Sequence, residues 1–195
     1  MEKNIAEIIN ASKEIYDKGL VSGKSGNISK RIKGSTGDIV AITPTLRSLS
    51  DLNEEDIVLV DMDGNVLTNG KPSSEVSMHL EIYKKRSDVN AIVHTHSAYA
   101  TGFAFSDKKL KRLEGFGEIK NPYLPTIEYE KPGSAELAKS AGENIKDTDV
   151  LILKNHGVIC VGDSLKEAKL LAVFVEETAK TQFITHALNS AEDLI

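Results

Sequence analysis

The 195-residue chain has only one cysteine, Cys160, which lies in the apolar run 157–161. A single cysteine excludes an internal disulfide, and its apolar neighbours favour a place in the core over catalysis or metal binding. Long apolar runs are also absent, since no stretch approaches the ~20 residues that span a bilayer and no apolar signal region follows Met1. We therefore expect a cytoplasmic protein that does not act at a membrane.

An excess of basic residues is missing as well. The chain has 24 Lys and Arg against 29 Asp and Glu, a formal net charge of -5. This balance argues against general nucleic-acid binding, although a local pocket can still hold a small anion. Internal repeats, low-complexity tracts and Pro/Ser-rich linkers are absent too. We expect one domain spanning residues 1–195, with a small molecule as its partner.

Hydrophobic periodicity predicts the secondary structure. Helices are expected at residues 3–19, 74–86, 97–105, 134–145 and 164–187, and strands at 38–43, 56–61, 90–95, 149–154 and 157–161. A glycine-rich loop is expected through Ser29, and residues 106–125 read as an irregular surface segment. Turn signals at 63–64 and 155–157 predict hairpins, whose strands are antiparallel. The expected fold class is α/β, with a mixed or mostly antiparallel sheet and layered helices.

Two histidines separated by one residue, His94 and His96, close an apolar strand. Residues i and i+2 of an extended chain point to the same face, so both imidazoles can reach one point. His156 follows a second apolar run, and Glu75 opens a predicted helix. Three imidazoles and a carboxylate form a chemically reasonable ligand set for a divalent metal ion.

Each of these residues also has a simpler explanation. A lone buried histidine is usually hydrogen-bonded in a core, and a carboxylate such as Glu75 in a first helical turn complements the helix dipole. His79, four residues after Glu75, is a rival ligand that we rank second, as a packing group or a residue that supports a ligand. His186, near the end of the last predicted helix, reads as an ordinary surface residue.

Three segments have features of an anion-binding site. Residues 19–25 resemble a phosphate-binding Walker loop, but they have one residue too few between the glycines and follow a helix, so we reject nucleotide binding. Residues 22–29 are rich in glycine and serine, and residues 43–45 leave a strand. Residues 71–75 lead into a helix, whose first N–H groups favour an anion. Taken alone, residues 22–29 are an ordinary loop, and Ser73 or Ser74 is an ordinary N-cap.

Read in order, five motifs resemble the class II aldolase and epimerase family. They are Ser25-Gly26-Asn27-Ile28-Ser29, Thr43-Pro44-Thr45, Pro72-Ser73-Ser74-Glu75, His94-Thr95-His96 and Asn155-His156-Gly157. The resemblance implies a three-layer fold in which helices flank a central, mainly antiparallel sheet. It also implies a homotetramer with fourfold symmetry and active sites between subunits.

The same resemblance implies roles for individual residues. His94, His96 and His156 would bind a divalent ion, most simply Zn²⁺, and Glu75 would be the catalytic acid/base that also ligates the metal when substrate is absent. A substrate phosphate would be held by Gly26, Asn27, Thr45, Leu46, Ser73 and Ser74. The implied reaction is reversible cleavage of a ketose 1-phosphate, similar to L-fuculose 1-phosphate, into dihydroxyacetone phosphate and a small aldehyde such as lactaldehyde.

The chain departs from the family pattern at two places. Leu46 stands where the family's aldolases commonly have glycine, and the adjacent Arg47 can add a charge to the site. A tyrosine that protonates the departing aldehyde oxygen has no counterpart near residues 114–116, so Tyr123 and Tyr129 are the candidates to replace it. These differences affect the choice of aldehyde rather than the metal chemistry.

Other activities share this pattern. Sugar-phosphate 4-epimerases resemble it with Asp in place of Glu75, which disfavours them. A methylthioribulose-1-phosphate dehydratase would keep the histidines and stays open. A non-catalytic interaction domain, similar to the adducin head, would lack the metal ligands, whereas all three histidines and Glu75 are present here.

Overall fold

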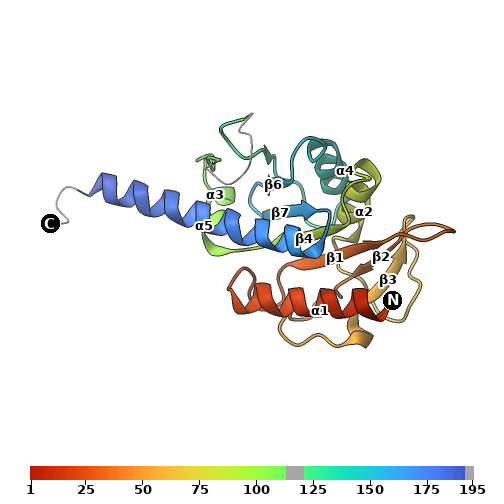
Figure 1. The fold of residues 1–195 in the computed structure, drawn as a ribbon. Coiled ribbons are helices and arrows are strands. Elements are labelled where there is room, and N and C mark those ends of the chain that lie inside the picture. Colours follow the sequence, from red (N-terminus) through yellow and green to blue (C-terminus); the bar gives the residue numbers. More distant parts are fainter. Residues whose placement is uncertain (113–120, 192–195) are drawn as a thin grey trace.

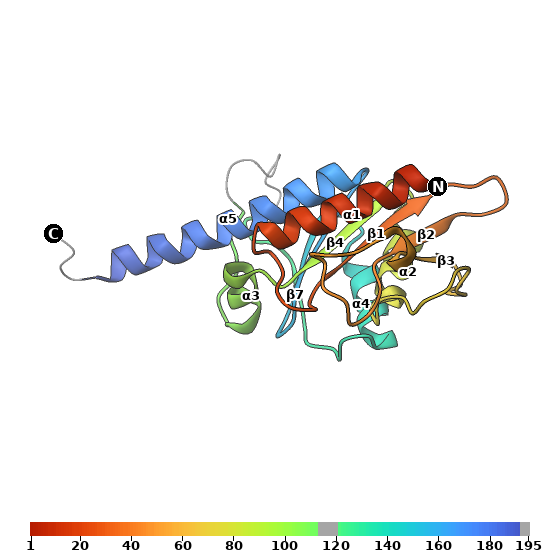
Figure 2. The same ribbon diagram turned by 90° about the horizontal axis from the view of Figure 1, so that it is seen from below.

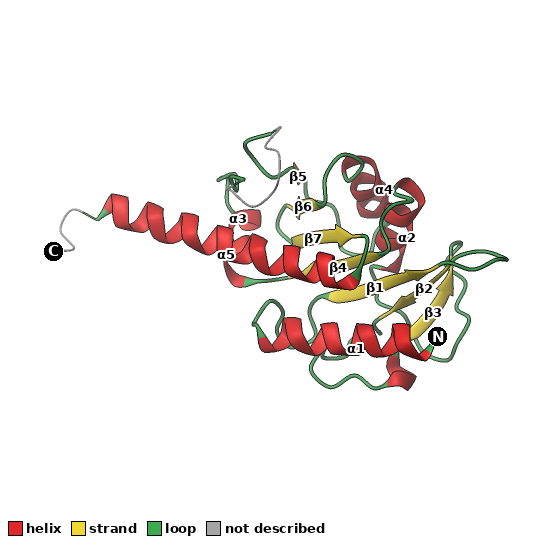
Figure 3. Cartoon of the chain, in the orientation of Figure 1, coloured by secondary structure: helices red, strands yellow, loops and turns green. Residues whose placement is uncertain are grey.

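The computed structural model describes residues 1–112 and 121–191. Within them the helices are α1 (Glu2–Asp17), the short 3-10 helix η1 (Glu54–Asp56), α2 (Val76–Lys85), α3 (Ala98–Phe105), α4 (Ala135–Asn144) and α5 (Leu165–Ser190). The strands are β1 (Asn27–Ile32), β2 (Ile39–Ile42), β3 (Val58–Asp61), β4 (Ala91–Thr95), β5 (Thr126–Ile127), β6 (Val150–Leu153) and β7 (Gly157–Gly162). Figure 3 shows both kinds of element in one view.

The strands of the described part form one sheet in the order β3-β2-β1-β4-β7-β6-β5. Neighbouring strands pair antiparallel except β5 and β6, which are parallel. The exception follows from the connectivity, because α4 lies between these two strands in the chain and parallel neighbours need such a crossover. The expectation of a mixed, mostly antiparallel sheet is confirmed.

Helices cover both faces of the sheet, as Figures 1 and 2 show. Strand β7 shows why both faces need cover, since successive strand residues point to opposite sides. Val158 and Cys160 join the core formed with α1, α3 and α5, whereas Ile159 and Val161 join the core formed with α2 and α4. The result is the three-layer α/β arrangement that the sequence predicts.

Cys160 is fully buried within β7. Burial raises the pKa of its thiol, so the reactive thiolate is disfavoured. Its expected place in the core is confirmed. In the described ranges, no helix combines the length and the apolar character that crossing a membrane requires.

The structure corrects the expectation of a loop through Ser29, because β1 already begins at Asn27. The pattern of this strand explains the error. Asn27, Ser29 and Arg31 are all buried, and Ile28 and Ile32 are its only aliphatic residues. A strand whose buried face is polar does not show the apolar alternation that identifies strands in a sequence.

Two other boundaries differ slightly from the expected ones. Helix α2 begins at Val76 rather than near Ser74, so Glu75 is the residue that precedes it. Helix α5 continues to Ser190, and Figure 1 shows its C-terminal part extending beyond the sheet. The hairpin expected at 63–64 is present, with Val60 paired to Val66 across the turn. Residues 114–116 lie outside the described part.

Candidate metal centre

The antiparallel pairing brings several segments to one edge of the sheet. Asn27 at the start of β1 lies opposite His94 near the end of β4. On the other side of β4, Thr95 lies opposite Val158, near the start of β7. His156 lies in the tight turn between β6 and β7, at the same edge. Residues that are far apart in the sequence therefore meet where β4 ends.

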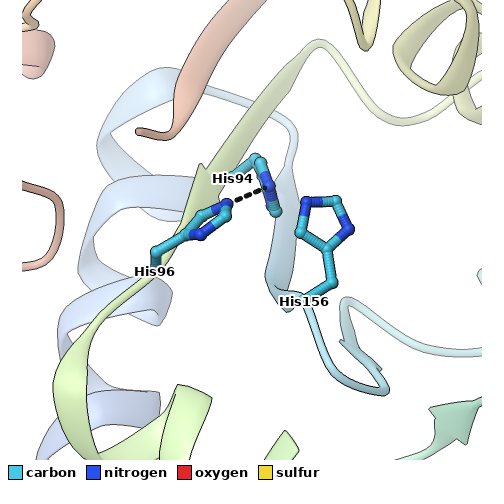
Figure 4. A group of neighbouring side chains, drawn as sticks. All are labelled: His94, His96 and His156. Carbon is cyan, nitrogen blue, oxygen red and sulfur yellow. Dashed lines mark hydrogen bonds between the residues drawn. The ribbon is translucent and has the colours of Figure 1, made fainter. Parts of the chain in front are cut away.

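The three histidine side chains converge at this edge, and Figure 4 shows the rings of His94, His96 and His156 close together. One candidate ligand atom from each lies within 4.8 Å of the others. His94 Nε2 and His96 Nε2 are 2.9 Å apart, and the ring centroids are separated by 4.7 to 5.0 Å. His96 lies just after β4, where its backbone N–H donates to the carbonyl of Leu20.

Glu75 is the fourth member of this group. Its Oε2 lies 3.0 Å from His94 Nε2, and its Oε1 lies 3.3 Å from His156 Nε2. Asn27 Nδ2 donates a hydrogen bond of 2.9 Å to Oε2. Only 5% of Glu75 is exposed, so its carboxylate is almost removed from water. The structure therefore brings together the four residues that the sequence proposes as ligands.

Burial and mutual charge set the protonation of the group. Burial lowers the pKa of His96 to about 3 and that of His156 to about 4, and the nearby His94 acts in the same direction. Burial alone would lower the pKa of His94, but the Glu75 carboxylate raises it above its ordinary value. Burial alone would raise the pKa of Glu75, but His94 and His156 hold it well below its ordinary value.

These residues fit a divalent cation. Neutral imidazoles and an ionised carboxylate are the forms that ligate metals, and they are the forms favoured here for His96, His156 and Glu75. His94 Nδ1 donates to the carbonyl of Val158 at 3.0 Å, which leaves Nε2 directed at the cluster. Glu75 Oε1 is buried without a hydrogen-bond partner among the described residues, as expected for an atom that a cation would contact.

Two glycines allow this close approach. A Cβ on Gly157 would lie 2.5 Å from the carbonyl oxygen of Thr95 and 3.2 Å from atoms of the His94 and His96 rings. A Cβ on Gly26, whose φ is +75°, would lie 2.4 Å from Val21 Cγ1 and 2.8 Å from the carbonyl oxygen of His94. A side chain at either position would displace the backbone that carries the histidines.

The segments proposed for phosphate binding lie beside one another near Glu75. Backbone hydrogen bonds join Thr45 N to the carbonyl of Lys71 and Ser73 N to the carbonyl of Thr43, at 3.1 and 3.0 Å. Ser73 Oγ accepts a 3.3 Å hydrogen bond from the backbone of Glu75. The explanation of Ser73 or Ser74 as an ordinary N-cap is wrong, because Glu75 occupies the N-cap position of α2.

Leu46 and Arg47, where the chain departs from the family pattern, are both at the surface. Leu46 has φ +58°, the left-handed conformation that favours glycine, and it is 72% exposed. The backbone at this departure from the family pattern thus keeps a glycine-like conformation. Arg47 donates to Asp56 at 3.1 Å, so its charge is paired at the surface.

The two other candidate histidines and the two candidate tyrosines lie at different places in the fold. His79 is not in the histidine cluster; its Nδ1 lies 2.6 Å from Ser29 Oγ. His186 is exposed on α5, as expected. Tyr129 follows β5 at the sheet edge where His156 follows β6, because these strands are parallel. Tyr123 precedes β5 and so belongs to the opposite edge.

Comparison with known proteins gives the family. The model of the Class II Aldolase and Adducin N-terminal domain matches residues 6–183. An L-fuculose phosphate aldolase of Methanococcus maripaludis is 40% identical over 185 residues, covering 95% of this chain and 99% of that protein. A 3-oxo-tetronate 4-phosphate decarboxylase of Haemophilus influenzae is 32% identical over 181 residues, covering 90% and 85%. A solved L-fuculose 1-phosphate aldolase superposes with a TM-score of 0.89 at 28% identity, covering 100% and 91%.

The chain belongs to the class II aldolase family. It is a lyase of the metal-dependent aldolase type. The buried group of His94, His96 and His156 is a place where the divalent metal of such an enzyme can bind.

Proposed function

We propose that the protein reversibly cleaves a ketose 1-phosphate, similar to L-fuculose 1-phosphate, into dihydroxyacetone phosphate and a small aldehyde such as lactaldehyde. The observation that carries this proposal is the buried Glu75 carboxylate. It lies between His94 and His156 and directly follows the segment that is proposed to hold the phosphate. The substrate carbon that exchanges a proton and the substrate phosphate can therefore be bound close to each other. The whole chain, residues 1–195, would act as one domain.

Zn²⁺ is the proposed ion, held by His94, His96 and His156, with Glu75 as a further ligand before substrate binds. Three uncharged imidazoles leave the charge of the ion largely uncompensated. When bound, the ion supplies positive charge beside the substrate carbonyl, where negative charge develops as the carbon–carbon bond breaks. Imidazole and carboxylate ligands also suit other first-row divalent ions, so metal replacement belongs in the test.

Glu75 would transfer the proton. Its lowered pKa means that it is ionised at neutral pH, so it is a base in the direction of bond formation. It then removes a proton from the carbon of dihydroxyacetone phosphate that attacks the aldehyde. In the direction of cleavage the protonated carboxyl group returns this proton to the same carbon. Proton exchange at one carbon is thus the role that its position supports.

The phosphate would be bound by Gly26, Asn27, Thr45, Leu46, Ser73 and Ser74. The hydrogen bonds that join residues 43–45 to residues 71–73 support this role, because they keep the two segments side by side. The left-handed conformation of Leu46 supports it too, since backbone N–H groups in such turns can face an anion. Loss of one of several such donors would mainly raise KM.

Tyr129 is the better candidate for the residue that protonates the aldehyde oxygen. Its support is its place at the metal-centre edge of the sheet, with half of the residue exposed. Tyr129→Phe removes only the hydroxyl and should lower kcat more than Tyr123→Phe, its control at the opposite edge. Equal losses in both variants would end this assignment.

We also propose a homotetramer with active sites between subunits. Exposed apolar residues on the projecting half of α5, namely Phe183, Ile184 and Leu188, support self-association. Light scattering on the purified protein checks the oligomeric state, and a monomeric mass contradicts it. The cytoplasmic location stays a prediction that cell fractionation can check.

A second candidate is decarboxylation of a 3-oxo sugar-acid phosphate, favoured by the identity to the 3-oxo-tetronate 4-phosphate decarboxylase. Cleavage of a carbon–carbon bond beside a carbonyl is common to both reactions, so the same metal and phosphate site can serve either. The second product separates them, because both reactions leave dihydroxyacetone phosphate, but the aldolase releases an aldehyde beside it whereas the decarboxylase releases carbon dioxide. The epimerase and dehydratase alternatives release neither an aldehyde nor carbon dioxide, so they would appear as conversion of the substrate without either product.

The deciding experiment is an assay of the purified protein with Zn²⁺, Mn²⁺ or Co²⁺ and a panel of ketose 1-phosphates. We expect metal-dependent release of dihydroxyacetone phosphate. His96→Ala should abolish it through loss of the ion, and Glu75→Gln should lower kcat by at least about 100-fold. The control is His186→Ala, an exposed histidine on α5. Unchanged turnover in the first two variants, or loss of water without carbon–carbon cleavage, overturns the proposal.

A further inference from the structure

One strand of the sheet presents a polar face where its neighbours present aliphatic ones. The core beneath α2 and α4 contains aliphatic side chains from the six other strands, which are Val40, Ile42, Val58, Val60, Ile92, Ile127, Leu151, Leu153, Ile159 and Val161. β1 contributes Asn27, Ser29 and Arg31 in their place, which are 5%, 0% and 6% exposed. Burying polar groups is unfavourable unless each finds a partner, so this strand calls for an explanation.

The partners of Asn27 and Ser29 lie on one side of α2 and at its start. Asn27 Nδ2 donates to Glu75 Oε2 at 2.9 Å. Ser29 Oγ lies 2.6 Å from His79 Nδ1 and 2.8 Å from the hydroxyl of Tyr83. All of these residues are at least 95% buried, so water does not compete for the bonds.

Arg31 completes the series at the far end. Its guanidinium donates to the backbone carbonyls of Tyr83 and Arg86, and it lies over the Tyr83 ring at 4.7 Å from the centroid. A cation over an aromatic face is attracted to it, and the bonds to the two carbonyls hold the C-terminal turn of α2. The polar contacts therefore run along the whole helix.

The spacing of the contacts is matched on the two elements. Asn27, Ser29 and Arg31 are two residues apart on β1, a step of about 6.6 Å. The α2 partners at 75, 79 and 83 are four residues apart, a step of about 6 Å on one helix face. The contacts can therefore form side by side without bending either element. We call these six residues the polar ladder.

The ladder leads to the carboxylate at the centre of the proposed chemistry. Glu75 precedes α2, and its side chain makes no capping bond to the helix, so the helix does not fix its direction. The carboxylate is held by Asn27 and faces the rings of His94 and His156. One turn later, His79 N donates to the carbonyl of Glu75, which ties the backbone at Glu75 to the next contact.

We propose that Ser29, His79 and Tyr83 are positioning residues for Glu75. They hold α2 in register against β1, and the register places the carboxylate between Asn27 and the histidines. None of the three touches the proposed reacting atoms. An aliphatic face would pack α2 against β1 equally tightly, but apolar contacts are not directional, whereas hydrogen bonds fix one register. This inference rests on the function proposed above.

The first test compares two deletions of a buried serine hydroxyl. Ser29→Ala removes the centre of the ladder, and Ser12→Ala is the matched control, since Ser12 is equally buried on α1 and its Oγ has no partner among the described residues. We expect Ser29→Ala to lower kcat about 10- to 100-fold with KM within about twofold, because misplacement affects the transferred proton more than phosphate binding. An unchanged kcat per folded, metal-loaded chain, with only a lower Tm, overturns the proposal.

Tyr83→Phe is the milder second variant, in case Ser29→Ala does not fold. It removes one hydroxyl at the far side of Ser29 and keeps the ring. A smaller loss in kcat, again without a matching rise in KM, supports the ladder. Equal kcat in Tyr83→Phe and wild type shows that Tyr83 is not part of it.

A conservative replacement of His79 separates positioning from packing. His79→Asn keeps a polar atom near the place of Nδ1, whereas His79→Leu keeps bulk and removes the polar atom. We expect the Asn variant to recover at least about threefold in kcat over the Leu variant at equal folded fraction. Equal rates in the two variants mean that His79 only fills space.

Co²⁺ titration followed by visible absorbance tests the ladder without any substrate. If Ser29 acts through Glu75, Ser29→Ala weakens Co²⁺ binding about fivefold in the wild-type background and leaves it unchanged in the Glu75→Gln background. Equal effects in both backgrounds, or none in either, overturn the inference. If wild type cleaves no ketose phosphate while this coupling is present, the proposed function fails and the ladder stands.

Discussion

At the scale of single residues, Gly157 is a position where an added side chain would disturb the metal centre. We predict that Gly157→Ala weakens divalent-metal binding about 10- to 100-fold, the loss typical of disturbed support around a ligand. The physical reason is the 2.5 Å approach of the added Cβ to the Thr95 carbonyl oxygen, with the rings of His94 and His96 at 3.2 Å. Metal titration by calorimetry measures the effect.

Gly102→Ala is the matched control for this change. Gly102 lies within α3 with nothing within 4 Å of an added Cβ, so alanine there should stabilise the helix by about 0.5–1 kcal/mol and leave metal binding unchanged. Wild-type metal affinity in Gly157→Ala would mean that the turn can move away from the histidines.

Sequence patterns predict the histidine cluster but not all of the residues around it. His94 and His96 are predictable because the two-residue period of an extended chain puts them on one side, and His156 because it ends another apolar run. The contact between Ser29 and His79 joins residues 50 positions apart and depends on how α2 lies against β1. No local period carries that information, so His79 could be ranked but its partner could not be named.

At the scale of elements, the contact between β1 and α2 predicts how stability depends on pH. Burial lowers the pKa of His79 to about 3, and its unfolded value is near 6.5. Between these two values the unfolded chain therefore binds a proton at His79 that the folded chain does not bind. This contribution to the free energy of unfolding is fully present above pH 6.5 and falls as the pH drops toward 3. The slope from this one residue is up to about 1.4 kcal/mol per pH unit.

Urea unfolding of the metal-free protein between pH 7 and pH 4 measures this slope. We expect His79→Asn to make it shallower by close to one proton, while His186→Asn, at an exposed position of α5, leaves it unchanged. The same slope in wild type and His79→Asn would show that His79 is protonated in the folded protein.

The elements themselves were predictable to different degrees. The expected bounds of the α-helices all lie within three residues of the observed ones in the described part. β1 was missed because its buried face is polar, and β5 because it has only two residues, Thr126 and Ile127. Both strands are defined by their neighbours rather than by their own composition.

At the scale of the whole molecule, the proposed ion would link segments that are far apart in the sequence. Its ligands come from the start of α2, the end of β4 and the turn between β6 and β7. Binding to the folded state alone stabilises it by about 2.7 kcal/mol when the free ion is at 100 times Kd. For a domain of this size, each kcal/mol raises Tm by about 2–4 °C, so we expect Zn²⁺ to raise Tm by about 5–11 °C.

Differential scanning calorimetry with Zn²⁺ and with a chelator measures this shift. His96→Ala should remove most of it, because two imidazoles and a carboxylate hold the ion less tightly than the full set. His186→Ala, whose side chain is exposed on α5, should keep the wild-type shift. A shift that survives in His96→Ala would place the stabilising ion elsewhere, and the metal centre would then not be the link between α2, β4 and the β6–β7 turn. A shift confined to chains with all three histidines ties the stability of the fold to the same residues that the proposed chemistry needs.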